Sequence, residues 1–210
     1  TLKRSKLVEF LKNRLDHNVI KYDHNIEKIE KNNDQIKLTF NEKKKVICDH
    51  LIISDGVFSK GKSIISNNEV KPSYNNSVAI RGNISKNKLN NLNKNNISLF
   101  LGQSLHYVIY PLNTDNEAFN FIGILKYNLT SKELENYNLF KDKAFNQVIR
   151  DKLQNRIPTN ILENLKNIKC FPVFVSKGFL KPVNNIFLVG DAFFAFPPSF
   201  AQGASQSIEG

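Results

Sequence analysis

Only two cysteines occur in the sequence, Cys48 and Cys170, and this scarcity excludes several classes of protein. They are far apart and neither belongs to a CxxC pair, so the sequence indicates neither a disulfide framework nor a zinc site. The four histidines form no metal-ligand pattern, so no metal is expected. No apolar run approaches the length of a membrane span, and no secretory leader opens the chain. We therefore expect a cytoplasmic protein without a transmembrane segment, while a peripheral contact with a membrane stays open.

Acidic residues are also scarce, because 19 aspartates and glutamates stand against 30 lysines and arginines, which gives a net charge of +11. Such an excess can attract nucleic acid or an anionic membrane. The lysines, however, are scattered among asparagines, as in residues 83–96, NISKNKLNNLNKNN, without the aromatic side chains or arginines that stack on bases or grip phosphates. A solvated surface rich in Lys and Asn explains the charge, and no nucleic-acid partner is expected.

Motifs for hydrolytic and metal-dependent catalysis are missing, because the sequence contains no GxSxG and no HExxH. Its nine glycines never follow the spacing of the dinucleotide-binding fingerprint GxGxxG. A chain of 210 residues with 40% hydrophobic residues can nevertheless bury a sizeable core, as one large domain or two small ones. Because it starts at Thr1 and stops inside an expected helix at Gly210, we expect a fragment of a longer protein.

The most informative pattern lies near the carboxyl end. Residues 186–189, IFLV, form a short apolar run that stops at Gly190-Asp191. This is typical of a buried parallel strand whose carboxyl end meets a ligand. Asp191 is therefore expected at the tip of a strand.

The residues that follow predict a loop and then a helix. Pro197-Pro198 prevents a regular strand or helix, so the chain must loop before residues 202–205, QGAS, begin a helix. The free amide groups of a helix start attract anions. Small residues, here Ala201, Gly203 and Ala204, let a bulky ligand approach the backbone.

This stretch resembles the second FAD-binding motif of flavin-dependent aromatic hydroxylases, the group that contains p-hydroxybenzoate hydroxylase, salicylate hydroxylase and the ubiquinone-biosynthesis hydroxylases. Their pattern reads GDAAHxxxPxxGQGxNxxxED. The matching positions are Gly190, Asp191, Ala192, Pro198, Gln202, Gly203 and Glu209. The departures are Phe193-Phe194 for Ala-His, Ala201 for the first Gly of GQG, Ser205 for Asn and Gly210 for Asp. The resemblance implies that FAD is bound by Gly190, Asp191, Pro198, Ala201, Gln202, Gly203, Ala204 and Ser205.

A second motif, SDGVFSKGKS, follows the apolar run at residues 51–53. It resembles the DGxxSxxR element of the same hydroxylases, with Asp55, Gly56 and Ser59 in place and Lys62 instead of arginine. In that family the element supports the flavin fold and the interaction with the nicotinamide nucleotide. The resemblance implies that Asp55 and Gly56 contribute to cofactor binding.

The same motif has an alternative interpretation as a P-loop, because residues 56–63 satisfy GxxxxGK[ST]. A P-loop needs a helix that starts at its Lys-Ser pair, because the amides and dipole of that helix hold the phosphates. Residues 66–68, SNN, and Pro72 are expected to leave no room for such a helix.

The start of the chain predicts an amphipathic helix over residues 2–15, since Leu7, Leu11 and Leu15 recur every four residues. One face of this helix is expected to pack inward. The hydroxylases carry an R-x-x-L-x-x-x-L helix whose arginine reaches the phosphate and ribityl side of the flavin. Arg4, Leu7 and Leu11 match it, so the resemblance implies that Arg4 contacts FAD.

Between these motifs, short apolar and alternating runs predict mainly β-structure. Strands are expected at residues 19–22, 25–30, 35–40, 46–48, 51–53, 77–84, 97–101, 105–110, 118–125 and 172–175. A helix is expected to pack through Phe145, Val148, Ile149 and Leu153. His106 lies between sheet residues; contact with the substrate is one interpretation, and a structural role is the preferred one.

The resemblance implies an α/β fold with α+β features, in which part of a Rossmann-like FAD/NAD(P)-binding domain is interrupted by an inserted, mainly β substrate domain. Residues 1–70 and 181–210 are expected to belong to the FAD-binding domain. Residues 71–180 are expected to form the substrate-binding sheet with its helices.

The resemblance further implies an FAD-dependent monooxygenase, in which NAD(P)H reduces FAD, O2 forms a flavin peroxide and that species hydroxylates a small aromatic or quinone-precursor substrate. No catalytic side chain is assigned. Without GxGxxG the chain is expected to be incomplete as an enzyme. Two alternatives from other classes stay open, namely a non-catalytic flavin- or partner-binding module and a P-loop NTPase through Gly56–Ser63. The sequence specifies neither the substrate, nor NADH over NADPH, nor the oligomeric state.

Overall fold

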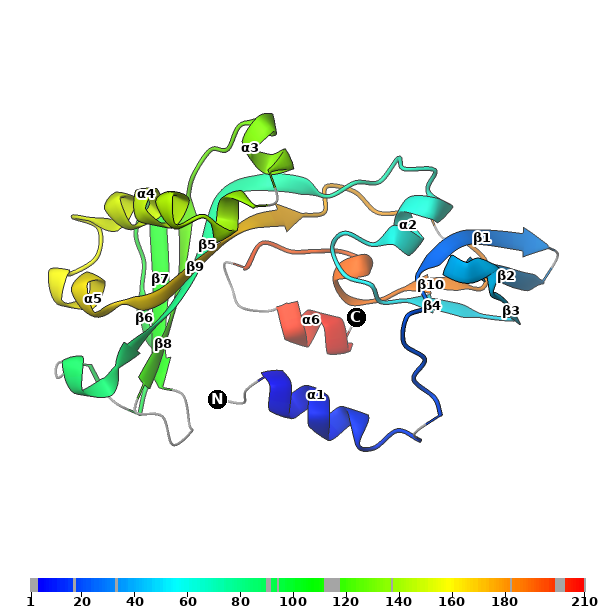
Figure 1. The fold of residues 1–210 in the computed structure, drawn as a ribbon, viewed down its shortest axis with the longest axis horizontal. Coiled ribbons are helices and arrows are strands. Elements are labelled where there is room, and N and C mark those ends of the chain that lie inside the picture. The colour runs from blue at the N-terminus through cyan, green and yellow to red at the C-terminus, as the bar shows by residue number, and fades with distance from the viewer. Residues whose placement is uncertain are drawn as a thin grey trace. The chain divides into compact units, whose positions relative to one another are not determined.

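The computed structural model describes residues 4–16, 18–32, 34–89, 92–93, 95–111, 118–136, 138–181, 183–198 and 203–209. The chain divides into two compact units. Unit 1 contains Thr1–Leu15 and Asn76–Val173, and unit 2 contains Asp16–Asn75 and Phe174–Gly210. The larger part of unit 1 is therefore inserted into the sequence of unit 2 (Figure 1).

Unit 1 is built on a five-stranded sheet with the order β6-β7-β8-β5-β9 (Figure 1). Neighbours from β6 to β5 pair antiparallel, and Arg81 on β5 and Val108 on β7 both lie opposite Ile122 on β8. The strands are β5 (Ser73–Ser85), β6 (Ser98–Phe100), β7 (Leu105–Pro111), β8 (Ala118–Lys126) and β9 (Lys166–Val175).

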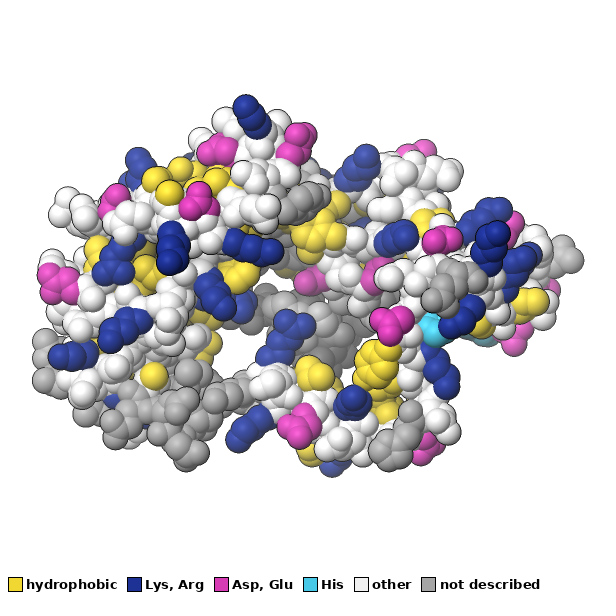
Figure 2. All heavy atoms as spheres, viewed as in Figure 1, with side chains coloured by type: hydrophobic (Ala, Val, Ile, Leu, Met, Phe, Trp, Pro, Cys, Tyr) yellow, Lys and Arg dark blue, Asp and Glu magenta, His cyan; other side chains and the backbone are white. Residues whose placement is uncertain are grey.

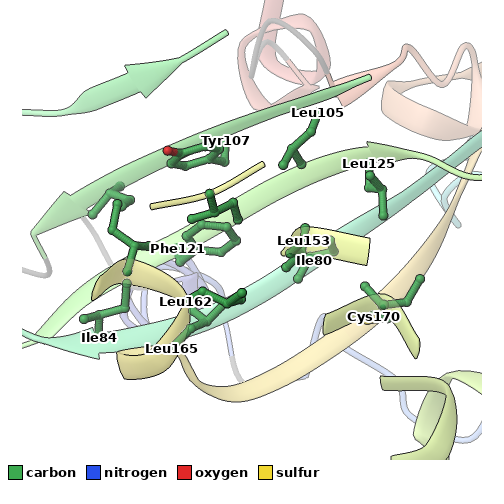
Figure 3. Close-up of a cluster of buried hydrophobic side chains, with 14 of the residues drawn as sticks. Ile80, Ile84, Leu105, Tyr107, Phe121, Leu125, Leu153, Leu162, Leu165 and Cys170 are labelled. Atoms are coloured by element: carbon green, nitrogen blue, oxygen red, sulfur yellow. The ribbon is translucent and has the colours of Figure 1, made fainter. Parts of the chain in front are cut away.

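The core of unit 1 lies between this sheet and two helices, α4 (Lys143–Leu153) and α5 (Thr159–Asn164) (Figure 3). On α4, Phe145, Ile149 and Leu153 recur every four residues and are buried, as predicted. Val148 was expected on the same face but is exposed, because its position three residues after Phe145 turns it toward the flank of the buried stripe. Asp142 begins the helix, since its Oδ1 accepts from the backbone N–H of Ala144 at 2.9 Å.

The two faces of the sheet differ in what covers them. On β7, Leu105, Tyr107 and Ile109 are buried in the core with the helices. Residues 106, 108 and 110 alternate with them and are only half-buried. We call the face that carries His106, Val108 and Tyr110 the open face.

Helix α1 (Arg4–Lys12) forms where the leucine spacing predicts a helix, but it buries no residue. Leu7, Val8 and Leu11 all remain exposed, so the expectation that one face packs inward is wrong. The leucine period determines which side chains share a face. It does not supply a surface for that face to contact. Unit 1 also contains η2 (Lys86–Lys88), α3 (Ser131–Glu135) and η3 (Leu139–Lys141).

Unit 2 contains two small sheets. β1 (Ile26–Asn32), β2 (Gln35–Phe40) and β3 (Lys45–Cys48) form an antiparallel meander, with η1 (Asn41–Lys43) between the last two. β4 (Leu51–Ile53) and β10 (Ile186–Leu188) form a parallel pair. The strand expected at residues 19–22 is absent. The backbone N–H of Val19 instead bonds to Asp16 in a turn, and Asp23 turns the chain again with a φ of 59°.

The core of unit 2 is smaller and consists of Ile36, Leu38, Ile53, Ile186 and Ala192. The described part of unit 2 also contains α2 (Lys60–Ile65), η4 (Gly190–Ala192) and α6 (Gly203–Glu209). Ile36 and Leu38 alternate with polar residues along β2, which explains why one face of the meander is buried.

Asparagine occupies many of the turn positions in this chain that need a left-handed backbone conformation, which glycine often occupies in other proteins. The backbone has a positive φ at Asn67, Asn68, Asn76, Asn155, Asn167 and Asn185. Asparagine tolerates this left-handed conformation better than other residues with a side chain. The asparagine-rich composition therefore supplies turns in a chain that has few glycines.

Lys and Arg side chains are spread over the face shown in Figure 2 rather than gathered into one patch. Within the described residues, no helix is both long and apolar enough to cross a membrane. Nor do three or more His, Cys, Asp or Glu side chains of that part of the chain come together as metal ligands would.

Candidate functional site

The two sequence motifs meet at one edge of the parallel pair in unit 2. Leu188 lies opposite Ile53, and the backbone N–H of Val189 donates to Ile53 O at 3.0 Å. Because the strands are parallel and in register, both point their carboxyl ends toward the same edge. Asp55 and Asp191 follow these ends, so residues far apart in the sequence come to one place.

The chain turns sharply after β10. Gly190 has a φ of +60°, and a Cβ built on it would lie 3.1 Å from Ser207 Oγ on α6. The backbone N–H groups of Phe193 and Phe194 both donate to Gly190 O at 3.0 Å. Glycine therefore suits this turn, because a side chain would be strained at this φ and would press on Ser207 Oγ. Asp191, next along the turn, is exposed.

The loop that follows is held at Ala195. Its N–H donates to Ser176 Oγ at 3.0 Å, and its carbonyl accepts from the N–H of Ser176 at 2.9 Å. Residues 194–197 have no regular structure, as Pro197-Pro198 predicts. Helix α6 then begins at Gly203, as the sequence also predicts. Apart from its chain neighbours and the backbone of α6, no atom of the described residues lies within 4 Å of a Cβ built on Gly203, so α6 is open to them on that side.

The SDGVFSKGKS motif has a structural role at the start of α2. Asp55 Oδ2 accepts from the N–H of Gly61 at 3.0 Å, and Ser59 Oγ accepts from the N–H of Lys62 at 2.8 Å. Gly56 takes a φ of +83°, which a residue with a Cβ adopts only with strain. Asp55, Gly56 and Ser59 together form the turn that connects β4 to α2.

The expectation that no helix fits after the P-loop-like sequence is wrong, because α2 runs from Lys60 to Ile65. Its caps at Asp55 and Ser59 supply the local hydrogen bonds that a short helix needs. These same contacts argue against a phosphate site. Side chains already occupy the N–H groups of Gly61 and Lys62, and the hydroxyl of Ser63 donates to Ser59 O at 3.0 Å.

Lys62 is itself buried, with 2% of its surface exposed. Burial lowers the pKa of its ammonium below the ordinary value of 10.5, and the nearby Asp55 carboxylate opposes this shift. A P-loop lysine must reach a bound phosphate with its charge, and the side chain of Lys62 on α2 is instead buried.

The structure brings together most of the site residues expected from the sequence. Unit 2 places Asp55 and Gly56 beside Gly190 and Asp191, and α6 with Gly203, Ala204 and Ser205 packs against η4. Pro198 is exposed in the intervening loop. Arg4 is exposed at the start of α1 in unit 1. Ala201 and Gln202 lie outside the described residues.

One feature beside these residues was not expected, a cluster of phenylalanine rings. Phe194 stacks on Phe179 with ring centroids 4.5 Å apart and contacts Phe196 at 4.8 Å. Phe179 also contacts Phe193 at 5.6 Å. The sequence signal was the replacement of Ala-His by Phe193-Phe194 directly after Asp191, but Phe179 lies too far away in the sequence for a local pattern to connect them.

No family model and no curated protein matches this sequence. Solved structures do match its fold. A variant of HpxO from Klebsiella pneumoniae, complexed with FAD, has a TM-score of 0.78 at 16% identity, over 99% of this chain and 53% of that one. A salicylate hydroxylase substrate complex has a TM-score of 0.79 at 17% identity, over 98% and 54%.

A third match is 2,6-dihydroxypyridine-3-hydroxylase from Arthrobacter nicotinovorans, with a TM-score of 0.68 at 15% identity over 89% of this chain and 53% of that one. This chain thus spans about half the length of the proteins that it matches. At these identities the likeness shows the fold. This chain has a mixed α/β fold that it shares with about half of an FAD-dependent aromatic hydroxylase.

Proposed function

We propose that this chain belongs to an FAD-dependent monooxygenase that hydroxylates a small aromatic or quinone-precursor substrate with NAD(P)H and O2. The observation that carries the proposal is the meeting of the two motifs at one edge of the β4–β10 pair, beside the start of α6. Ligands of open α/β sheets bind at the carboxyl ends of parallel strands. The fold shared with HpxO, which was solved in complex with FAD, and with a salicylate hydroxylase supports the choice of ligand.

The residues at this edge fit a dinucleotide. Asp191 offers an exposed carboxylate at a strand tip, suited to accept hydrogen bonds from the hydroxyl groups of a ribose or ribityl chain. The amide groups at the start of α6 suit a phosphate, and the space beside Gly203 lets it approach. When bound, FAD would supply the redox chemistry, while this chain orients the cofactor and the ring and excludes water.

We further propose that the parallel pair is part of a larger Rossmann-like sheet. Parallel strands are ordinarily covered on both faces. One face of the pair is buried through Ile53 and Ile186, but Ile52 and Phe187 on the other face are 65% and 53% exposed. Additional strands and helices would bury these side chains. In this proposal unit 2 serves the cofactor, and the sheet of unit 1 serves the substrate.

The cytoplasm remains the proposed location. Cys48 and Cys170 are both free thiols and belong to different units. Free thiols persist in reducing compartments.

The test measures FAD binding by the protein as encoded, through the visible flavin spectrum after gel filtration. A hydrogen bond to a charged group contributes roughly 1.5 to 3 kcal/mol. Asp191→Ala should therefore raise the Kd for FAD by about tenfold to a hundredfold. Asp49→Ala is the matched control, because it removes the same charge before β4, at the opposite end of the pair. Its FAD affinity should not change.

Each result has a distinct meaning. Equal FAD affinity in folded Asp191→Ala and Asp49→Ala proteins would refute the site. Bound FAD that neither NADPH nor NADH reduces would favour the non-catalytic flavin-binding module. Magnesium-dependent binding of ATP, lost in Lys62→Arg, would instead establish the P-loop.

A further inference from the structure

We propose that Phe179 is a positioning residue, which clamps the loop of residues 193–197 in one conformation and so sets the affinity for FAD of the edge where β4 and β10 end. The inference deepens the proposed function and rests on it in one respect, that FAD is the ligand of this edge. Four rings carry the argument, and we call Phe179, Phe193, Phe194 and Phe196 the phenylalanine cluster.

The loop lies between two residues that the sequence resemblance assigns to FAD. Asp191 precedes it and Pro198 follows it, and both are exposed. Residues 194–197 belong to no helix or strand, so no repeating pattern of backbone hydrogen bonds fixes their conformation. Contacts with another segment of unit 2 therefore decide where the loop lies.

Ser176 supplies one half of the clamp. Its Oγ accepts from the N–H of Ala195 at 3.0 Å, and its own N–H donates to Ala195 O at 2.9 Å. Ala195 is buried at this point. The two bonds hold the loop at a single residue, and they do not by themselves fix the residues on either side of it.

Phe179 supplies the other half, three residues further along the same segment. Its ring stacks on Phe194 with centroids 4.5 Å apart and an angle of 26° between the ring planes. It also meets Phe193 at 5.6 Å, and Phe196 contacts Phe194 at 4.8 Å. These separations are typical of favourable aromatic pairs. The rings thus extend the clamp to both sides of Ala195.

The exposure of the rings indicates positioning rather than core packing. Phe179 is 62% exposed, Phe196 49% and Phe193 44%, and none of the three is among the side chains of either core. A ring that stays largely in water stabilises the folded chain little through burial. Its contacts instead restrict the conformations that the loop takes before a ligand arrives, which lowers the entropy cost of binding.

The clamp is a feature of this chain and not of the hydroxylase pattern. The pattern GDAAH has Ala and His at the positions of Phe193 and Phe194. An alanine has no ring to meet Phe179, so the pattern does not specify these contacts. The two replacements, which the resemblance leaves unexplained, acquire a role through Phe179.

The clamp acts on affinity through the population of the conformation that binds. The apparent Kd equals the intrinsic Kd divided by the fraction of molecules in that conformation. A loop that spends about a tenth of its time in the competent conformation therefore binds about tenfold more weakly. We expect loss of the Phe179 ring to have an effect of this size.

The first measurement is hydrogen exchange of the protein as encoded, without ligand, followed by mass spectrometry on a peptide that covers residues 190–198. This peptide should exchange about tenfold faster in Phe179→Ala than in the wild type, because the bond from the Ala195 N–H opens more often. Phe179→Tyr keeps the ring and should exchange like the wild type. Residues 35–40 in β2 should stay protected in every variant, which reports that unit 2 is folded.

The second measurement is the Kd for FAD of the same samples. Phe179→Ala should raise it about tenfold, and Phe179→Tyr should restore the wild-type value. Ile47→Ala is the matched control, because it truncates another apolar side chain of unit 2, 61% exposed on β3, and should change neither the exchange of the loop nor the Kd. Saturating FAD should slow the exchange of the loop in Phe179→Ala, since the ligand selects the clamped conformation.

Unchanged exchange of the loop in Phe179→Ala, or an unchanged Kd in a variant whose loop exchanges faster, would overturn the inference while leaving the flavin proposal in place. Faster exchange throughout β2 would also overturn it, because Phe179 would then hold the fold and not the loop. Absence of FAD binding by the wild-type protein would overturn the flavin proposal and the ligand of this loop. Faster exchange of the loop in Phe179→Ala would in that case still support the clamp.

Discussion

Lys62 shows at the scale of single residues how the same sequence can indicate two chemistries. Its spacing satisfies a P-loop pattern, yet its N–H is capped by Ser59 and its side chain is buried beside Asp55. The pattern specifies residue types and not the partners of their backbone amides. In this chain those amides already donate to side chains, so they are not free to bind a phosphate.

Burial of Lys62 leads to a pH-dependent prediction. Because the pKa is lower in the folded chain than the ordinary 10.5, the charged form is disfavoured by folding. This destabilisation is fully present below the folded-state pKa and disappears as the pH rises toward 10.5. Lys62→Met should therefore raise the urea midpoint at neutral pH, and the gain should shrink in alkaline buffer. Lys60→Met, on the exposed side of α2, should show no such trend, and a lower midpoint for Lys62→Met at neutral pH would contradict the prediction.

The positions of Gly190 and Asp191 could be predicted, because an apolar run that ends at Gly-Asp is a local signal. The cap that Asp55 makes with Gly61, and the pairing of the two motifs across the sheet, could not. Each depends on which backbone groups meet after folding. No local pattern in the sequence carries that information.

Among the helices, α1 and α4 show that the spacing of apolar residues and the packing of a helix are separate properties. Both have apolar residues at helical spacing, but Leu11 is 54% exposed while Ile149 is fully buried. The core strands could be predicted closely, β2 from the alternation of apolar and polar residues and β7 and β8 from their aromatic-rich β sequences. The strand expected at residues 19–22 was wrong because strand pattern alone provides no neighbour to pair with.

This contrast predicts different costs for matched substitutions. Leu11→Ala in α1 should change the free energy of unfolding of the chain by no more than about 0.5 kcal/mol. Ile149→Ala in α4 should cost about 2 to 5 kcal/mol, because it leaves a cavity in the core of unit 1. Urea denaturation followed by circular dichroism measures both. A loss above about 1 kcal/mol for Leu11→Ala would mean that α1 packs against the chain after all.

The molecule as a whole has a separate hydrophobic core in each of its two units. Each unit also contains one cysteine. Cys170 is buried in the core of unit 1, where burial raises the pKa of its thiol to about 12. Cys48 packs at the edge of the smaller core of unit 2, and burial raises its pKa as well. The reactivity of each thiol therefore reports the opening of one unit.

We expect the two thiols to become reactive at different urea concentrations. In mildly alkaline buffer the native Cys170 stays protonated and enclosed, so a thiol reagent should not modify it before unit 1 unfolds. Cys48 should react at lower urea, since the core of unit 2 contains fewer buried side chains. Cys48→Ser and Cys170→Ser proteins assign the signals. Simultaneous exposure of both thiols would show that the units unfold as one.

The pairing of β4 with β10 also has a consequence during synthesis. These neighbours are separated by roughly 130 residues, and closing a loop of that length costs on the order of 4 kcal/mol in chain entropy. On the ribosome, β4 emerges long before its partner, whereas the strands of unit 1 and its helices α3, α4 and α5 follow one another directly. We expect the inserted unit to fold first and to draw residues 51–53 and 186–188 within reach of each other. Until then the nascent chain presents an unpaired strand edge, a natural binding site for a chaperone.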